Sequence, residues 1–247
     1  SGTISRIFVS SLGRRVNVLI IGSNSTIGQR LGNRLSKTHH VSFAGRSGPD
    51  IYIDLAGADF DLIQTKQYEV VIHVASDFGG DSIADIKRAT NVNSGGILKT
   101  CELAKVCGAK QLIYLSSHSA SYGPGNPYYN SYALTKRHSE ELAQMACQTW
   151  DINLLILRPT QVYDIEEKCR SHQEMFYFIL DQAQKGQDIT LFGNTDPVRN
   201  FLLVDDLCEI INLSLSRNVT GLYSCSAKES HTLGEIAQMA YDIFQTF

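Results

Sequence analysis

The sequence predicts an α/β protein built on a doubly wound, mostly parallel sheet, and three observations support this fold class. First, six apolar runs have the character of strands, at 16–23, 40–45, 50–55, 68–76, 110–117 and 152–159. Second, helix-forming segments lie between them, at 25–37, 82–107 and 131–148. Third, the run at 68–76 is apolar on both faces, as expected of a central parallel strand. Strands that alternate with helices in this way form a parallel sheet.

The first strand and the first helix form the clearest unit. The run VNVLIIGS at 16–23 passes through Gly22, and the following segment places Ile27, Leu31 and Leu35 at a spacing of four. Residues four apart share one face of a helix, so these side chains indicate an amphipathic helix that packs on the sheet. Sheets of this kind bind ligands beyond the carboxyl ends of their strands.

The pattern of strands and helices changes after Tyr163, which indicates a second, smaller lobe. We expect a flexible N-terminal extension at 1–15, a first domain at 16–163 and a partial lobe at 164–247. The lobe contains the helix-forming EMFYFILDQAQKG and the apolar NFLLVDDL. Asp205 and Asp206 are expected to cap the next helix, which can pack back onto the first domain, so that the two are interleaved.

Composition and charge exclude several classes of protein. The 247 residues are 43% hydrophobic and 19% charged, which suffices for a sizeable core. A net charge of -3 argues against nucleic-acid binding, which needs a strongly basic face. No apolar run approaches the roughly 18 residues of a membrane span, so no membrane partner is expected. The six cysteines are widely spaced, so we expect reduced thiols, no metal and a cytoplasmic location.

The turn after the first strand carries a phosphate-binding pattern. The segment GSNSTIG at 22–28 matches GxxSxxG. Glycine lets the backbone approach a pyrophosphate closely, and the N-terminus of the next helix favours its negative charge. Ser25 replaces the middle glycine of the more familiar pattern, but its side chain is small and can add a hydroxyl contact. The turn therefore predicts a dinucleotide site of the Rossmann type.

Two residues bear on which dinucleotide binds. The second strand ends in AGRSG and offers no acid to a ribose 2′-hydroxyl. Arg46 can instead pair with a 2′-phosphate, which slightly favours NADP over NAD, although an arginine solvated in a loop fits the sequence equally well. Asp54 is a candidate for contacting the adenine amino group or, alternatively, for capping the next helix.

Further motifs follow in a recognisable order. They are GxxSxxG at 22–28, IDL at 53–55, HVAS at 73–76, VNSGG at 92–96, LSSHSASYG at 115–123, YxxxK at 132–136, LRPTQVY at 157–163 and VRNFLLVDDL at 198–207. With them the chain resembles the extended short-chain dehydrogenases/reductases of the NAD-dependent epimerase/dehydratase family over nearly its whole length. The resemblance implies NAD or NADP, a nucleotide-sugar substrate and a homodimer. Members of the family usually continue for several dozen residues beyond the position of Phe247. We therefore expect either a truncated chain or a naturally short relative, and in both cases a partial substrate lobe.

The resemblance assigns residues to each part of the site. Those expected to bind the cofactor are Gly22, Ser25, Thr26, Ile27, Gly28, Arg46, Asp54, Leu55, Val74, Ala75, Ser76, Asn93 and Lys136. Ser119 and Arg199 are expected to bind the substrate, Arg199 through a diphosphate that its planar cation can contact with two hydrogen bonds.

Tyr132 and Lys136 form the predicted proton-transfer pair. Because they are four residues apart on a helix, the ammonium of Lys136 can stand near the phenol of Tyr132. A free tyrosine titrates near ~10, so a base that works near neutrality needs about 4 kcal/mol of preference for tyrosinate. Burial alone acts in the opposite direction. The ammonium and the positive ring of an oxidised cofactor both act in the required direction.

The residue that polarises the substrate remains open. The family has Ser or Thr at the position that His118 occupies here. An imidazole can donate a hydrogen bond or carry a proton, but Ser117 or Ser119 could take the role, and we rank Ser117 first.

These residues predict a nucleotide-sugar epimerase or reductase that uses hydride transfer. No pair of acids accompanies LSSHSASYG, which disfavours dehydration. The alternative is a dinucleotide-sensing regulator or scaffold with this fold and little or no catalytic activity. His118 and the short loop before Tyr132 support this alternative.

Overall fold

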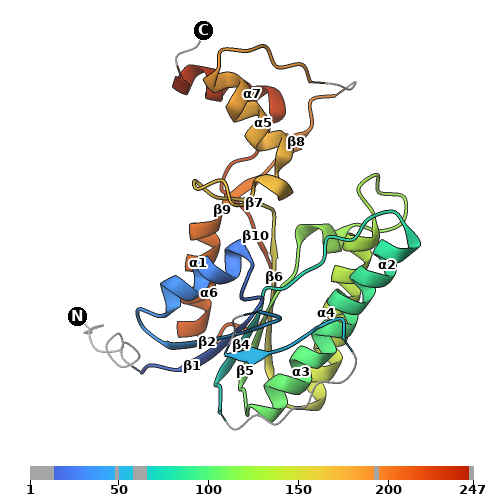
Figure 1. Ribbon diagram of the computed structural model, residues 1–247, viewed down its shortest axis with the longest axis vertical. Helices are drawn as coiled ribbons and strands as arrows, with labels where there is room; N and C mark the ends of the chain where they lie inside the picture. Colours follow the sequence, from blue (N-terminus) through green and yellow to red (C-terminus); the bar gives the residue numbers. More distant parts are fainter. Residues whose placement is uncertain (1–13, 48–49, 58–65, 192–194, 245–247) are drawn as a thin grey trace, which may run out of the picture. The chain divides into compact units, whose positions relative to one another are not determined.

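The computed structural model describes residues 14–47, 50–57, 66–191 and 195–244, and it confirms the predicted fold class (Figure 1). The expected N-terminal extension lies almost wholly outside these residues. The described chain divides into two compact units. The first runs to Arg158 and includes Cys208–Tyr223, and the second comprises Pro159–Leu207 and the residues from Ser224 onward. The chain thus passes from the first unit to the second, back to the first and again to the second. The first passage follows Arg158, whereas the boundary expected from the sequence, for two interleaved parts, follows Tyr163.

A seven-stranded sheet organises the first unit. Its strands are β1 (Asn17–Ile21), β2 (His40–Gly45), β3 (Ile51–Tyr52), β4 (Val70–His73), β5 (Gln111–Leu115), β6 (Asn153–Pro159) and β10 (Gly221–Cys225), in the order β10-β6-β5-β4-β1-β2-β3. The pairings from β3 through to β6 are parallel. The strand order reverses between β1 and β4, and such a reversal is where these sheets bind ligands.

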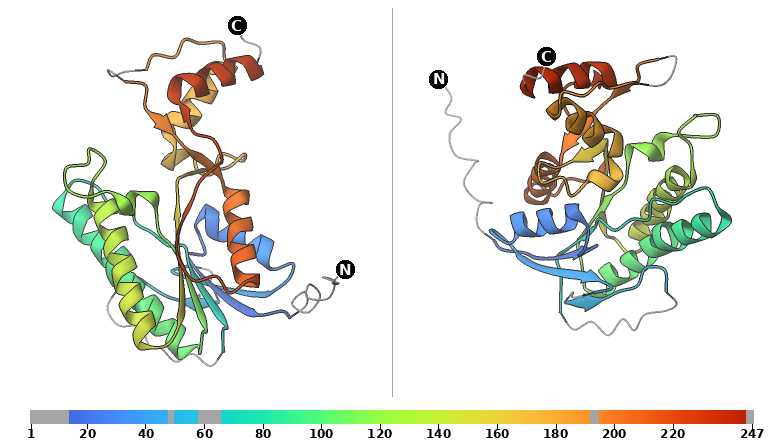
Figure 2. Two further views of the ribbon diagram at one scale, coloured as in Figure 1. Left: turned by 180° about the vertical axis from the view of Figure 1, so that it is seen from behind. Right: turned by 45° about the horizontal axis from the view of Figure 1, so that its top comes forward.

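Helices cover both faces of this sheet (Figures 1 and 2). One face carries α1 (Thr26–Leu35) and α6 (Val204–Ser216), which an ion pair between Arg34 and Glu209 joins. The other carries α2 (Ile83–Ala89), the π-helical turn η1 (Thr90–Gly95), α3 (Gly96–Val106) and α4 (Ser131–Thr149).

The core lies on both faces of the central strands, as the apolar run at 68–76 predicts. Leu19, Val71 and Leu112 follow one another in register across β1, β4 and β5, and all are fully buried. Their neighbours Ile20, Ile72, Ile113 and Leu155 are also fully buried. The single helix expected at 82–107 is divided by η1, a register change in backbone hydrogen bonding that side-chain periodicity does not reveal.

The second unit is smaller and contains short strands. Its parallel pair is β7 (Gln161–Tyr163) with β9 (Phe201–Leu203), and its antiparallel pair is β8 (Val198–Arg199) with β11 (His231–Thr232). Helices α5 (Glu174–Gln184) and α7 (Leu233–Phe244) pack through Ile179, Ala183 and Ala240, and a short turn, η3, spans Arg170–His172.

One detail of the second unit differs from the prediction. Asp205 and Asp206 do not precede α6 as caps but lie in its first turn, because β9 leads directly into a helix that starts at Val204. Their carboxylates still favour the helix, because its N-terminal end carries a partial positive charge.

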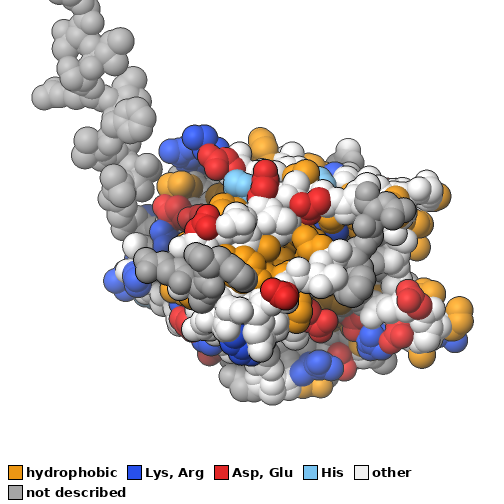
Figure 3. Space-filling view, turned by 90° about the horizontal axis from the view of Figure 1, so that it is seen from above, with side chains coloured by type: hydrophobic (Ala, Val, Ile, Leu, Met, Phe, Trp, Pro, Cys, Tyr) orange, Lys and Arg blue, Asp and Glu red, His pale blue; other side chains and the backbone are white. Residues whose placement is uncertain are grey.

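The surface is mixed in charge. On the face shown in Figure 3, basic and acidic side chains of the described residues are interspersed. Within the described part of the chain, no helix has the length and apolar character needed to cross a membrane. All six cysteines are buried and none forms a disulfide in the described residues.

Candidate functional site

The first turn has no room for side chains at its two glycines. Gly22 has a φ of +112°, and a Cβ there would lie 2.8 Å from the backbone nitrogen of Ala75. A Cβ on Gly28 would lie 2.4 Å from the carbonyl oxygen of Gly22. Neighbouring protein atoms already fill the space that a side chain would need at either position, so this close packing of the turn requires glycine at both.

Ser25 has a structural role in this turn. Its hydroxyl donates to the Gly22 carbonyl at 3.0 Å and accepts from the Gly28 amide at 2.9 Å, which caps α1. The one proton of the Ser25 hydroxyl is therefore used within the turn. Thr26 and Ile27, also predicted to bind the cofactor, open the helix beside it.

The residues after β2 and those after β3 make different contacts. Arg46 is exposed directly after β2. The next residue, Ser47, accepts a hydrogen bond of 2.7 Å from Asn24, which ties this loop to the turn. One carboxylate oxygen of Asp54 accepts from the Ala56 amide at 3.1 Å, a local contact in the segment after β3.

Tyr132 and Lys136 lie in the first two turns of α4. Asn130 caps this helix through a 2.9 Å hydrogen bond from the Ala133 amide. Lys136 is 2% exposed, and its Nζ donates to the Leu115 carbonyl at 2.8 Å. This nitrogen lies 4.9 Å from the centre of the Tyr114 ring and 5.9 Å from that of Tyr132. The pair is therefore held at the end of β5.

Burial dominates the electrostatics of the pair. Burial raises the pKa of Tyr132, while hydrogen bonding with Ser117 and Ser76 acts in the opposite direction. Burial also lowers the pKa of Lys136 to about 7, against the opposing effect of the Glu140 charge. In the protein by itself, the neighbouring lysine thus does not lower the pKa of the phenol below its ordinary value. The lowering expected from the sequence requires both the lysine and a bound, oxidised cofactor.

Of the three candidates for polarising the substrate, Ser117 lies with Tyr132. Its hydroxyl also accepts from the Ser119 amide at 3.2 Å and caps the short helix η2 (His118–Ser121). The His118 side chain is exposed and packs edge-on against Tyr122, with ring centres 5.6 Å apart. The geometry therefore groups Ser117 with the phenol and leaves His118 outside this group.

Asn93, in the π-helical turn, connects the end of β4 to α4. Its side-chain oxygen accepts from the Asp77 amide at 2.8 Å, and its nitrogen donates to the Asp77 carbonyl at 2.8 Å and to Thr135 Oγ1 at 3.0 Å. Ser76 donates to the same oxygen at 3.4 Å. The Asn93 side chain is thus used within the protein, which makes it a support for the site. Leu55 and Val74 are buried, and Ala75 is partly buried.

Two features of the site were not foreseen. Glu140 is buried one turn beyond Lys136, forms two hydrogen bonds of 2.8 and 2.5 Å with Arg158 and accepts a third from Ser116. The spacing of four from Tyr132 through Lys136 to Glu140 could have indicated it. Phe78 stacks on Tyr132, a contact between residues far apart in the sequence.

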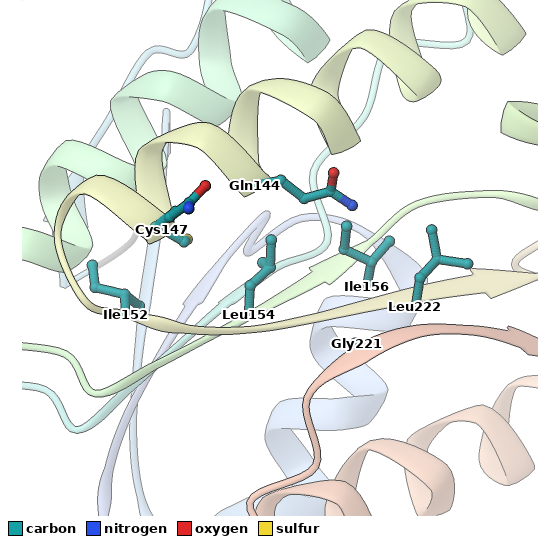
Figure 4. Close-up of a pocket in the computed structure, with 8 residues that line it drawn as sticks. Gln144, Cys147, Ile152, Leu154, Ile156, Gly221 and Leu222 are labelled. Atoms are coloured by element: carbon teal, nitrogen blue, oxygen red, sulfur yellow. The ribbon is translucent and has the colours of Figure 1, made fainter.

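Arg199 and a pocket of the first unit are two further features of the structure. Arg199 belongs to the second unit, on β8 opposite His231. A pocket of about 260 Å³ in the first unit is lined from α4, β6 and β10, and Figure 4 shows Gln144, Cys147 and Ile156 around it. None of its lining residues is a predicted site residue.

Several solved structures have the same fold. UDP-N-acetylglucosamine 4-epimerase from Bacillus cereus superposes with a TM-score of 0.76 at 18% identity, covering 94% of this chain and 82% of that chain. The Bordetella bronchiseptica enzyme WbmF in complex with NAD+ superposes with a TM-score of 0.79 at 18% identity, covering 96% and 80%.

Curated sequence relatives include UDP-sugar 4-epimerases. A putative UDP-glucose 4-epimerase of Methanocaldococcus jannaschii is 25% identical over 176 residues, which is 66% of this chain and 57% of the relative. A probable UDP-glucuronate 4-epimerase of Rhizobium meliloti is 30% identical over 159 residues, 59% of this chain and 46% of the relative. The chain spans about half the length of these curated relatives. The model of the NAD dependent epimerase/dehydratase family matches residues 18–224, and the chain belongs to this family.

Proposed function

We propose that this protein is an NAD(P)-dependent nucleotide-sugar epimerase in which Tyr132 and Lys136 handle the proton. The observation that carries the proposal is the grouping of Tyr132, Ser117, Ser76 and buried Lys136 beyond the carboxyl ends of β4 and β5. The names of the relatives, several of them UDP-sugar 4-epimerases, support a UDP-sugar as the substrate.

The first turn fits a dinucleotide. The N-terminus of α1 suits a pyrophosphate because it carries partial positive charge, and Gly22 and Gly28 permit the tight turn that leads from β1 into this helix. The residues that would hold the cofactor are Gly22, Thr26, Ile27, Gly28, Arg46, Asp54, Leu55, Val74, Ala75, Ser76 and Lys136. When bound, NAD supplies a reversible hydride acceptor.

Tyr132 and Ser117 would transfer the proton of the substrate hydroxyl and bind its oxygen. Tyr132 takes a proton from a sugar hydroxyl and returns it, while Ser117 donates a hydrogen bond to the same oxygen. Because burial raises the pKa of Tyr132, its phenolate needs positive charge nearby. Lys136 provides such charge when protonated, and its hydrogen bond to Leu115 fixes where that charge lies.

The remaining parts of the proposal concern the substrate lobe and assembly. We propose that the second unit binds the nucleotide, with Arg199 at the diphosphate. We also propose that the protein is a homodimer in which α3 and α4 form the interface. Leu98 and Val106 on α3 and Met145 on α4 are exposed apolar side chains that a dimer would cover. Sedimentation of wild type and of Leu98→Glu tests the dimer, since a buried charge would dissociate it.

One experiment tests the function and separates its variants. The purified protein is first analysed for a copurifying dinucleotide by mass spectrometry and absorbance, and is then incubated with a panel of UDP-sugars that are followed by NMR. An epimerase interconverts two sugars without net consumption of cofactor. A reductase consumes NAD(P)H in step with product, and a regulator binds the dinucleotide and changes none of the sugars.

A further inference from the structure

The ring of Phe78 lies against the ring of Tyr132. Their centres are 5.0 Å apart and their planes differ by 20°, which is a stacked arrangement. Phe78 is 53% exposed, and Tyr132 is only partly exposed. The phenol is therefore covered on one face by a side chain whose own outer surface is open to solvent or to a ligand.

The loop that carries Phe78 is fixed on its first side. Both backbone groups of Asp77 bind the buried Asn93, at 2.8 Å each. The Asp77 carboxylate accepts from the Gly79 amide at 2.8 Å and from Arg88 Nε at 2.7 Å. Arg88 also donates to the Gly79 carbonyl at 3.3 Å. The residues on both sides of Phe78 are thus tied to α2 and η1.

The loop is fixed on its second side to the helix that bears Tyr132. The Gly80 amide donates to Ser131 Oγ at 3.2 Å, and this hydroxyl donates to the Gly80 carbonyl at 2.9 Å. Ser131 directly precedes Tyr132. A Cβ on Gly79, where φ is +72°, would lie 2.3 Å from the same hydroxyl. The glycine therefore permits a contact that holds Phe78 and Tyr132 in one rigid frame.

A frame of this kind has a chemical use. The Tyr132 phenol must keep its oxygen near Ser117 and Ser76, and an unrestrained ring would spend part of its time in other rotamers. A ring stacked on its face restricts those rotamers, and the exposed surface of Phe78 extends an apolar wall beside the phenol.

We propose that Phe78 is a positioning residue that holds the plane of Tyr132 and presents an aromatic surface to the substrate sugar. This inference rests on the proposed function. It commits to an aromatic ring as the required feature, because an aliphatic side chain cannot stack and covers less of the Tyr132 ring.

The test compares Phe78→Leu, Phe78→Tyr and the control Ile83→Ala. Ile83, at the start of α2, is 68% exposed and lies outside the proposed site. We expect Phe78→Leu to lower the plateau kcat about tenfold, since a stacked aromatic pair is worth about one such factor. Its acid limb should move to lower pH, because a better hydrated phenol ionises more easily. Phe78→Tyr and Ile83→Ala should stay within about twofold of wild type. A Leu variant with an unchanged plateau and pH profile, or a Tyr variant that loses as much as the Leu variant, would overturn the proposal.

A second measurement keeps this test independent of turnover. The ionisation of Tyr132 is taken from ultraviolet difference titrations against Tyr132→Phe, in the wild type and in Phe78→Leu. The proposal expects Tyr132 to titrate at lower pH in the Leu variant, because Phe78 no longer covers the ring. Equal titration in both backgrounds refutes it. If wild type changes no sugar, the proposed function fails, whereas this titration still decides the role of Phe78.

Discussion

The buried Lys136 should lower the stability of the folded protein, and replacing it with methionine should make the protein more stable. Burial lowers its pKa from 10.5 to about 7. In the folded protein the lysine therefore binds its proton less tightly than in the unfolded chain. Stability falls as the pH drops from near 10 to near 7, and nearly the whole cost of this group is present at pH 7.

The size of the effect follows from that difference. A difference in pKa of this size corresponds to about 5 kcal/mol at pH 7. Methionine removes this cost, but it leaves the Leu115 carbonyl without the hydrogen bond from the lysine. An unpaired buried carbonyl costs about 1–3 kcal/mol, which offsets part of the gain in stability. We expect Lys136→Met to raise the free energy of unfolding by about 2–4 kcal/mol at pH 7, and the melting temperature by about 5–10 °C.

The assay is thermal and urea unfolding of Lys136→Met and wild type at several pH values between 6 and 10. Lys87→Met, at an exposed position of α2, is the matched control and should have little effect. The gain at Lys136 should shrink as the pH approaches ~10, because the unfolded lysine is then losing its proton as well. A variant that is less stable than wild type at pH 7, or a gain that is the same at every pH, would refute this reasoning.

Three further predictions concern the rest of the site. Gly22→Ala should abolish dinucleotide binding measured by calorimetry, because its Cβ would meet Ala75 at 2.8 Å; binding within threefold of wild type would contradict this. Glu140→Gln should destabilise the protein by about 2–4 kcal/mol in urea unfolding, because it leaves Arg158 without its ion pair, and Arg158→Met in addition should restore part of the loss; a fully additive double variant would argue against the pair. Arg46→Asp should shift the ratio of the Kd values for NADP and NAD by at least about tenfold towards NAD if Arg46 binds a 2′-phosphate; an unchanged ratio would show that this arginine is only solvated.

The parts of the fold and site that were predictable are local in sequence. The glycines of GxxSxxG predict the first turn because both lie within one segment of seven residues and the backbone of the turn requires them. In the structure, α1 directly follows this turn. The spacing of Tyr132 and Lys136 likewise predicts one helix face, and both residues lie on α4. Apolar runs predict the central strands because both faces of those strands are buried.

The parts that could not be predicted depend on distant contacts. Phe78 meets Tyr132 only because the loop after β4 is tied to Asn93 and Ser131. The direction of the Tyr132 pKa depends on how deeply surrounding elements bury the ring, which the YxxxK spacing does not contain. The use of the Ser25 proton within its own turn is also invisible in the pattern, because serine fits both a cap and a phosphate contact.

The most direct test of the account is the turnover of Tyr132→Phe with the UDP-sugar that wild type converts. The variant lacks only the hydroxyl that is proposed to handle the proton. We expect it to bind the dinucleotide as wild type does and to lose about 10²–10⁴-fold in kcat, the usual contribution of such a group. A variant that keeps wild-type turnover would contradict the assignment of Tyr132.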